Sequence, residues 1–230
     1  HIIECTDEKE PTCTKGGMSG VWVCISCEEV LFENVAVNPL GHNYINGECI
    51  RCKEAESKDG MKFQLQDDGY YLEDVGTIKG QTINVPLMYN NQYVVGILDG
   101  AFDKAEYAYT IYLPSSIKTI EDGAFEKCKM LQNIIVDPMN YYFESVDNCL
   151  VEIATKTLLV GGANAIIPEG IVNIAENAYK NHIGVTYIKI PASVESIGKN
   201  AFDGCLNILL IEVDVNNKSY YSKDNCLIDA

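Results

Sequence analysis

The sequence lacks the motifs that mark the common catalytic sites. Its 230 residues contain no Gly-x-Ser-x-Gly nucleophile turn, no His-Glu-x-x-His, no Walker loop and no dinucleotide fingerprint. Carboxylates are numerous, but they fall at positions that we expect to face solvent. We therefore predict that the protein is not an enzyme.

Positive charge and long apolar runs are also scarce. Lys and Arg number 17 against 33 Asp and Glu, which gives a formal net charge of -16. A field of this sign repels phosphate backbones and anionic headgroups, so we expect no nucleic-acid partner and no membrane surface. No apolar run approaches the ~20 residues that span a bilayer, which argues against membrane insertion. The chain begins at His1 rather than Met, which is compatible with removal of a targeting segment.

Residues 1–56 are predicted to form a separate cysteine-rich head. Six of the ten cysteines lie within the first 52 residues, where apolar periodicity is weak and turn residues such as Gly16-Gly17 and Asn46-Gly47 are frequent. A segment this short buries little apolar surface, so it needs a metal or disulfides to hold it together.

Two Cys-x-x-Cys pairs in the head have the spacing of a zinc ribbon. Two-residue spacing lets both sulfurs of a pair reach one tetrahedral ion, and 21 residues separate the pairs. The candidate zinc ligands are Cys24, Cys27, Cys49 and Cys52, with Cys13 and His42 as further ligands. The alternative is a disulfide-stapled head, because an exported protein meets an oxidising environment.

The rest of the chain is organised by internal repetition. Four segments share the pattern Ile-x-x-x-Ala followed by Phe or Tyr, and they begin at Ile97, Ile120, Ile174 and Ile197. The first two begin 23 residues apart, as do the last two, and the two pairs are offset by 77 residues. Residues 147–150, Asp-Asn-Cys-Leu, recur at the same offset. Such self-similarity predicts a solenoid.

Each unit has a simple physical interpretation. Alternation in triplets such as Ile111-Tyr112-Leu113 predicts a half-exposed strand, which the following proline ends. A second short extended piece follows, and then the Ala-Phe pair, which we expect on a short helical turn. Ala permits close approach, whereas Phe fills the gap between coils. Cys128 and Cys205 follow as small buried residues. We predict a mainly β repeat solenoid over residues 75–230, after a linker and lead-in strand over 57–74.

Three irregularities interrupt the repeat. Five extra residues occur around Tyr89-Asn90-Asn91. Residues 134–166 replace one unit with a longer one, whose segments 150–153 and 157–160 predict a hairpin. The copy of that longer unit stops at Ala230, so the array has no obvious C-terminal cap. Either this end is a shortened cap, or its open edge packs against a partner.

The repeat resembles the BspA-like leucine-rich repeat family, which is found largely in surface proteins of bacteria and some protists. Residues 190–205 fill every marked position of its pattern, Ile-Pro-x-x-Val-x-x-Ile-x-x-x-Ala-Phe-x-x-Cys. The head is similar to small cysteine modules on secreted proteins of gut anaerobes, although Glu28 and Lys53 stand where those modules often carry Gly. The resemblance implies an exported or surface-displayed protein of bacteria that adheres to host matrix or to other cells.

Solenoids bind ligands through the outward side chains of their stacked strands. Strand alternation predicts that these candidate ligand-binding residues face outward: Thr110, Tyr112, Ile135, Tyr187, Lys189 and Glu212. The ligand is expected to be a protein or glycan of a host or neighbouring cell. Residues 141–143 and 220–221 form a second aromatic group.

His182 is the only histidine of the repeats, and it stands where other units have Cys128 and Cys205. We therefore interpret it as a core replacement and not as a catalytic group. A non-catalytic spacer, or a module that self-associates through its C-terminal repeat edge, is the alternative to a binding protein.

Overall fold

The computed structural model describes residues 60–77, 81–162 and 166–230 in full, and before them the backbone of seven short strands. These strands pair antiparallel as β1-β3-β4, β2-β5 and β6-β7. Their bounds are β1 (Ile3–Thr6), β2 (Gly17–Met18), β3 (Val21–Cys24), β4 (Val30–Phe32), β5 (Ala36–Val37), β6 (Tyr44–Ile45) and β7 (Glu48–Cys49).

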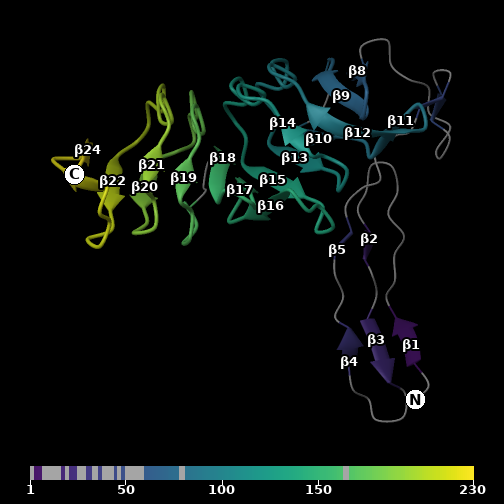
Figure 1. Ribbon diagram of the computed structural model, residues 1–230, viewed down its shortest axis with the longest axis horizontal. Helices are drawn as coiled ribbons and strands as arrows, with labels where there is room; N and C mark the ends of the chain where they lie inside the picture. The colour runs from purple at the N-terminus through teal and green to yellow at the C-terminus, as the bar shows by residue number, and fades with distance from the viewer. Residues whose placement is uncertain are drawn as a thin grey trace.

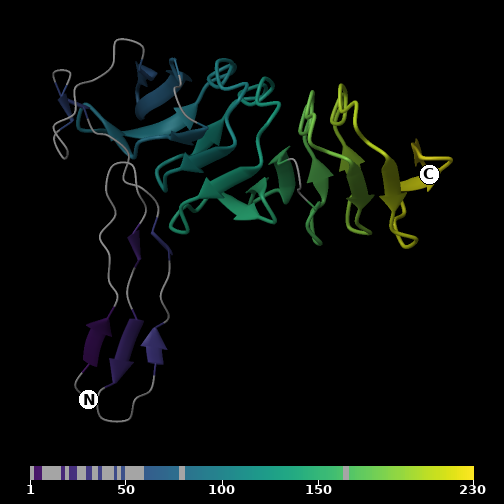
Figure 2. The same cartoon turned by 180° about the vertical axis from the view of Figure 1, so that it is seen from behind.

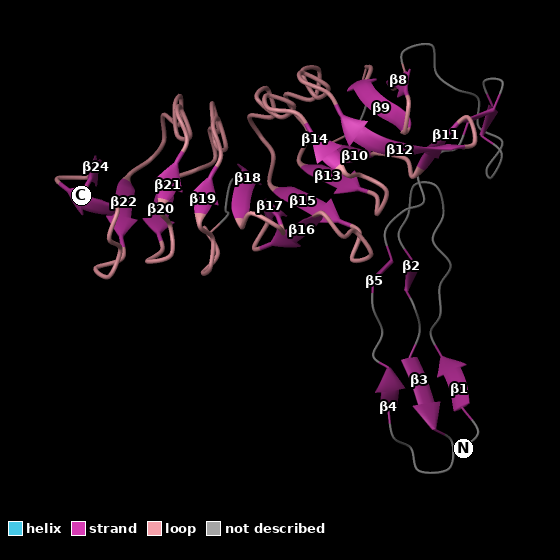
Figure 3. Cartoon of the chain, in the orientation of Figure 1, coloured by secondary structure: helices cyan, strands magenta, loops and turns pink. Residues whose placement is uncertain are grey.

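From residue 60 onward the chain forms a β-solenoid of about six turns, which confirms the predicted repeat architecture. Figure 1 shows the strands following one another along the array from β8 to β24, and Figure 2 shows the same stack from behind. None of the described residues lies in a helix, and the described part of the array consists of strands joined by turns and loops (Figure 3).

Two rows of parallel strands run along the solenoid. The first row pairs β10-β13-β15 and then β20-β22. Its strands are β10 (Thr82–Asn84), β13 (Thr110–Leu113), β15 (Asn133–Val136), β20 (Tyr187–Ile190) and β22 (Leu210–Val213). The second row pairs β9-β12-β14 and then β18-β19-β21. Its strands are β9 (Gly69–Asp74), β12 (Gln92–Ile97), β14 (Thr119–Ile120), β18 (Thr157–Gly161), β19 (Asn173–Ile174) and β21 (Ser196–Ile197).

The remaining strands form hairpins. They are β8 (Lys62–Gln66), β11 (Met88–Tyr89), β16 (Phe143–Val146), β17 (Cys149–Glu152), β23 (Tyr220–Lys223) and β24 (Cys226–Asp229). Of these, β8, β11, β16 and β17 join the sheets of the second row, whereas β23 and β24 form a sheet of their own. The hairpin predicted within residues 134–166 is confirmed, because β17 and β18 pair antiparallel. Asp147-Asn148 and Asp224-Asn225 turn two of the hairpins with positive φ at both residues, the geometry of a type I′ turn.

The Ala-Phe pairs do not lie on the short helical turn that the sequence predicted. They lie in consecutive turns, closed by hydrogen bonds such as Asp103 N to Gly100 O at 2.9 Å and Ala105 N to Phe102 O at 2.8 Å. The residue before each Ala has a positive φ, whether it is glycine (Gly100, Gly123) or asparagine (Asn177, Asn200). A left-handed residue in every unit interrupts right-handed helix, which explains why this prediction was wrong.

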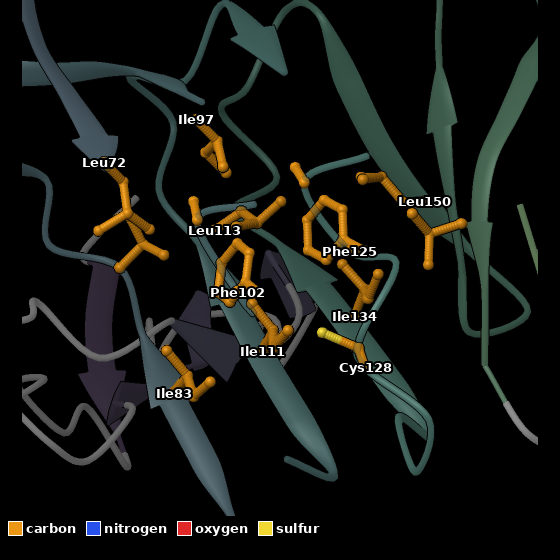
Figure 4. Packing of buried hydrophobic residues seen from close by; sticks show 14 of the residues in the cluster. Leu72, Ile83, Ile97, Phe102, Ile111, Leu113, Phe125, Cys128, Ile134 and Leu150 are labelled. Atoms are coloured by element: carbon orange, nitrogen blue, oxygen red, sulfur yellow. The ribbon is translucent and has the colours of Figure 1, made fainter. Parts of the chain in front are cut away.

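The aromatic residues of the Ala-Phe pairs stack between neighbouring coils in the core, which is otherwise mostly aliphatic. The rings of Phe102 and Phe125 stack with centroids 4.7 Å apart, and those of Tyr179 and Phe202 lie 5.5 Å apart. Figure 4 shows the rings of Phe102 and Phe125 side by side, next to the strand residues Ile111 and Ile134. Adjacent coils also share backbone hydrogen bonds at these turns, as from Phe102 N to Ala124 O. Each coil thus completes its core only against its neighbours.

Candidate ligand-binding face

The six predicted ligand-binding residues all lie on the outward side of the first row. In β13, Ile111 and Leu113 are buried, whereas Thr110 and Tyr112 are partly exposed. The same alternation holds in β15, and β20 repeats it with exposed Tyr187 and Lys189. The strand pleat therefore directs every second side chain outward.

Within each sheet of the first row, the parallel register aligns these side chains in two files, and the files of both sheets together form the first-row face. One file holds Thr82, Thr110, Asn133, Tyr187 and Leu210. The other holds Asn84, Tyr112, Ile135, Lys189 and Glu212. Tyr112 lies beside Ile135, and Lys189 lies beside Glu212, but these two pairs belong to different sheets. The six predicted residues thus form two groups, not one continuous cluster.

A residue that sequence reasoning missed lies between the two groups in chain order. Ile166 precedes Ile167-Pro168 just as Tyr112 precedes Leu113-Pro114, and its side chain is 62% exposed. The sequence did contain a signal for Ile166, because this residue stands directly before the apolar residue that precedes the proline. Leu210 was missed as well, although it is the register partner of Tyr187 and is itself exposed.

The two ends of the face differ in charge and polarity. Near β13 and β15 the outward residues are uncharged, and Asn133 Nδ2 lies 3.5 Å from Thr110 Oγ1. Near β20 and β22 the Tyr187 hydroxyl donates to the Glu212 carboxylate, and this hydrogen bond raises the pKa of Tyr187. The bond fixes the Tyr187 ring beside Glu212 before any ligand arrives, so less side-chain entropy remains to be lost on binding.

His182 is buried, as expected of a core replacement. It is 3% exposed and lies with Cys128 and Tyr179 along a cavity of about 40 Å³. Burial lowers the pKa of His182, so the neutral ring is favoured. Neither ring nitrogen has a hydrogen-bond partner of good geometry. A cavity of this volume is large enough for a water molecule that would satisfy one of them.

Gly161 and Gly162, at the end of the inserted hairpin, lie where neighbouring groups leave no space for a side chain. A Cβ on Gly161 would come within 2.0 Å of the Tyr179 ring, and one on Gly162 within 2.2 Å of the Gln132 carbonyl oxygen. Neither position therefore has room for a side chain, which is a packing reason for glycine.

The predicted zinc ligands Cys13, Cys24, Cys27, His42, Cys49 and Cys52 have side chains outside the described residues. Zinc or disulfides in the head therefore stay predictions. Over residues 60–77, 81–162 and 166–230, no three His, Cys, Asp or Glu side chains gather as a metal site would require. The same ranges contain no helix long and apolar enough to cross a membrane.

The family of the chain follows from its repeats. The family described as "BspA type Leucine rich repeat region" matches this chain over residues 81–150 and 162–228, in six copies of the repeat. The chain therefore belongs to the BspA-type leucine-rich repeat family, which confirms the resemblance drawn from residues 190–205.

Solved structures of bacterial leucine-rich repeat proteins are similar to this chain. A leucine rich cell surface protein from Faecalibacterium prausnitzii is 20% identical with a TM-score of 0.36, over 75% of this chain and 57% of that one. The leucine-rich repeat protein of T. pallidum is 20% identical with a TM-score of 0.43, over 67% and 69% of the two chains. The pneumococcal vaccine antigen PcpA is 16% identical with a TM-score of 0.43, over 75% and 53%. The chain spans little more than half of the first and third of these. No curated protein matches it.

Proposed function

We propose that this chain is a non-catalytic binding module, exported and displayed on a bacterial surface, that holds a protein ligand on its first-row face. The observation that carries the proposal is the set of outward apolar side chains on successive coils, in two groups on the first row with Ile166 between them in chain order. Tyr112, Ile135, Ile166, Tyr187 and Leu210 are all partly or largely exposed. An apolar patch bordered by polar residues is typical of an interaction site.

The shape of the face favours a protein over a small molecule. Neighbouring strands of a sheet lie about 4.8 Å apart, so a file of outward residues on successive coils forms a long, shallow surface. Extended surfaces of this kind match the area of ordinary protein–protein interfaces. Tyrosine is among the residues that dominate such interfaces, because its ring is rigid and its hydroxyl is polar.

The test is a matrix-protein and glycan array probed with the full chain and with the variant Tyr112→Ala/Tyr187→Ala/Lys189→Ala. We expect a reproducible protein hit that the triple variant loses. The matched control is Tyr107→Ala/Leu206→Ala, because both side chains are highly exposed but lie in turns and not on the strands of the first row. Binding that survives in the triple variant, or that disappears in the control, would place the site elsewhere.

A second candidate function is self-association through the C-terminal edge. The two copies of the longer unit differ in burial there: Phe143, Cys149 and Leu150 are buried, whereas Cys226 is exposed, and Tyr220 and Leu227 are only partly covered. In the first copy β17 pairs with β16 and β18, whereas β24 pairs only with β23. An unpaired edge with apolar side chains is a template for association with a second copy.

Sedimentation velocity over a wide dilution range tests this second function. Association that weakens on dilution, and that Ile228→Lys on β24 abolishes, would support it. The equivalent exposed substitution far from the edge, Tyr107→Lys, should leave the association unchanged. A monomer at every concentration would refute it, and would leave the first-row proposal untouched.

A further inference from the structure

A concave site that shares no residue with the first-row face lies where three consecutive coils leave a cavity of about 560 Å³. Its volume falls within the range of ~300–1,000 Å³ typical of small-ligand sites. The lining contains three tyrosines, a methionine, two serines and one opposite-charge pair. We call this cavity the tyrosine pocket, and its residues are Asp68, Leu87, Tyr93, Val95, Ser115, Ser116, Lys118, Met139, Tyr141 and Tyr142.

The inserted residues around Tyr89 build one wall of the pocket. Asn90 and Asn91 have φ of 47° and 64°, and they turn β11 back onto β12, which places Leu87 and Tyr93 at the cavity. The Tyr89 ring anchors this hairpin, since it stacks on Phe63 with centroids 4.5 Å apart.

Asn140 fixes the opposite wall. Its amide nitrogen donates to the carbonyl oxygens of Pro114 and Ile117, at 3.1 and 2.9 Å. Its side-chain oxygen accepts from the backbone N–H groups of Tyr142 and Phe143, at 2.8 and 2.9 Å. The Asn140 side chain, which donates two hydrogen bonds and accepts two, therefore holds the loop of Met139, Tyr141 and Tyr142 to the preceding coil.

The internal duplication shows that the fold does not require the lining residues. Asn217 stands 77 residues after Asn140 and repeats all four hydrogen bonds, to Pro191 O, Val194 O, Ser219 N and Tyr220 N. The scaffold is therefore the same in both copies. The lining differs, because Lys218 and Ser219 stand where the first copy has Tyr141 and Tyr142, and Asn216 stands in place of Met139.

The apolar lining residues are exposed to a degree that packing does not explain. Tyr141 is 82% exposed, Met139 67%, Tyr93 55% and Tyr142 48%. Phe143, the next residue of the same aromatic run, is 3% exposed and supplies the core contact of this loop. Exposed single apolar residues are ordinary, but four of them around one cavity form a patch that favours a ligand.

The polar lining residues supply both donors and acceptors of hydrogen bonds. Lys118 Nζ lies 3.9 Å from an Asp68 carboxylate oxygen, so the charges of the pair largely cancel across the cavity. Ser116 already donates to the Val94 carbonyl oxygen at 2.6 Å, which leaves its oxygen free to accept. The site is therefore locally neutral, and it can satisfy a ligand that presents many hydroxyl groups.

We propose that the tyrosine pocket binds a neutral oligosaccharide. A pyranose ring has an apolar face of C–H groups that suits a tyrosine ring, and a rim of hydroxyls that both donate and accept. A proline-rich peptide would also suit aromatic walls. Its backbone offers few N–H donors, however, so acceptors of the pocket such as the Ser116 hydroxyl oxygen would lose water without gaining a partner.

Saturation-transfer difference NMR on the full chain tests the proposal. The probes are neutral di- and trisaccharides of glucose, galactose, mannose, fucose, N-acetylglucosamine and N-acetylgalactosamine, with decaproline alongside. The test variant is Tyr141→Lys/Tyr142→Ser, which installs the residues that the second copy carries on the same scaffold. Circular dichroism and the thermal midpoint of this variant should match the wild type.

At least one saccharide is expected to give ring-proton signals whose apparent affinity falls about tenfold or more in the swap variant, as loss of two aromatic contacts implies. Tyr107→Ser, a change of an exposed tyrosine outside the pocket, should leave the affinity unchanged. The first-row triple variant should also retain saccharide binding, which separates this site from the proposed protein-binding face. No signal from any saccharide, equal signals in the swap variant, or binding of decaproline alone would overturn the proposal.

Discussion

The asparagine pair Asn140 and Asn217 allows a sharp test of how the solenoid is held together. Each side chain makes four hydrogen bonds to backbone groups, with the same partners 77 residues apart. They differ in surroundings, because Asn140 is 7% exposed whereas Asn217 is only partly buried. Replacing each asparagine by alanine therefore removes the same four hydrogen bonds, once at a buried position and once at a position that water can reach.

The expected magnitudes follow from that difference. A protein hydrogen bond contributes about 0.5–1.5 kcal/mol net, and a buried partner left unsatisfied costs about 1–3 kcal/mol. Three of the four bonds of Asn140 are buried. We expect Asn140→Ala to lower the free energy of unfolding by about 3–5 kcal/mol, and Asn217→Ala by about 1–2 kcal/mol, since water can replace the lost partner there.

Urea unfolding followed by circular dichroism measures both changes, with the slope of the transition as a check that unfolding stays cooperative. A free energy of unfolding for Asn140→Ala within about 1 kcal/mol of the wild type would refute this expectation. Equal losses in the free energy of unfolding of the two variants would also refute it, because burial would then not decide how much stability the lost hydrogen bonds contribute. The exposed substitution Tyr107→Ala supplies the baseline.

Three further predictions concern the core and the head. Phe102→Ala removes a fully buried ring and should cost about 3–5 kcal/mol in urea unfolding, and a loss under 1 kcal/mol would contradict the packing shown in Figure 4. Burial lowers the pKa of His182, so the unfolded chain binds the proton more readily and stability should fall as the pH drops below about 6.5. His182→Cys should reduce that fall in thermal midpoint between pH 7 and pH 5, and an unchanged fall would assign it to other groups. Elemental analysis of protein purified without chelator should find zinc in the head, whereas no metal together with no free thiols would establish disulfides.

Much of the array could be predicted because stacking imposes a period on the sequence. The residues that fill the core of the regular coils, such as Ile111 and Phe102, recur at a fixed spacing, which identified the repeat and its strands. The same alternation correctly placed Tyr112 and Lys189 outward. It missed Ile166, because the residues before Pro168 lack the alternating triplet that marks the other strands.

The turn carrying the Ala-Phe pair was predicted wrongly for a local reason. Short apolar segments with Ala suit a helix, but the preceding Gly or Asn adopts a left-handed conformation in each unit. Glycine and asparagine both tolerate positive φ, yet neither requires it, so the conformation becomes fixed only when the next coil accepts hydrogen bonds at this turn.

The sequence by itself determined the repeat, the strand faces, the family and the position of the inserted hairpin, because each of these depends on local spacing. The tertiary structure alone decided the tyrosine pocket. Its walls come from Tyr93, Ser115 and Tyr141, which lie on three different coils. Only the stacking of those coils, with Asn140 holding one loop to the next, brings the side chains around one cavity.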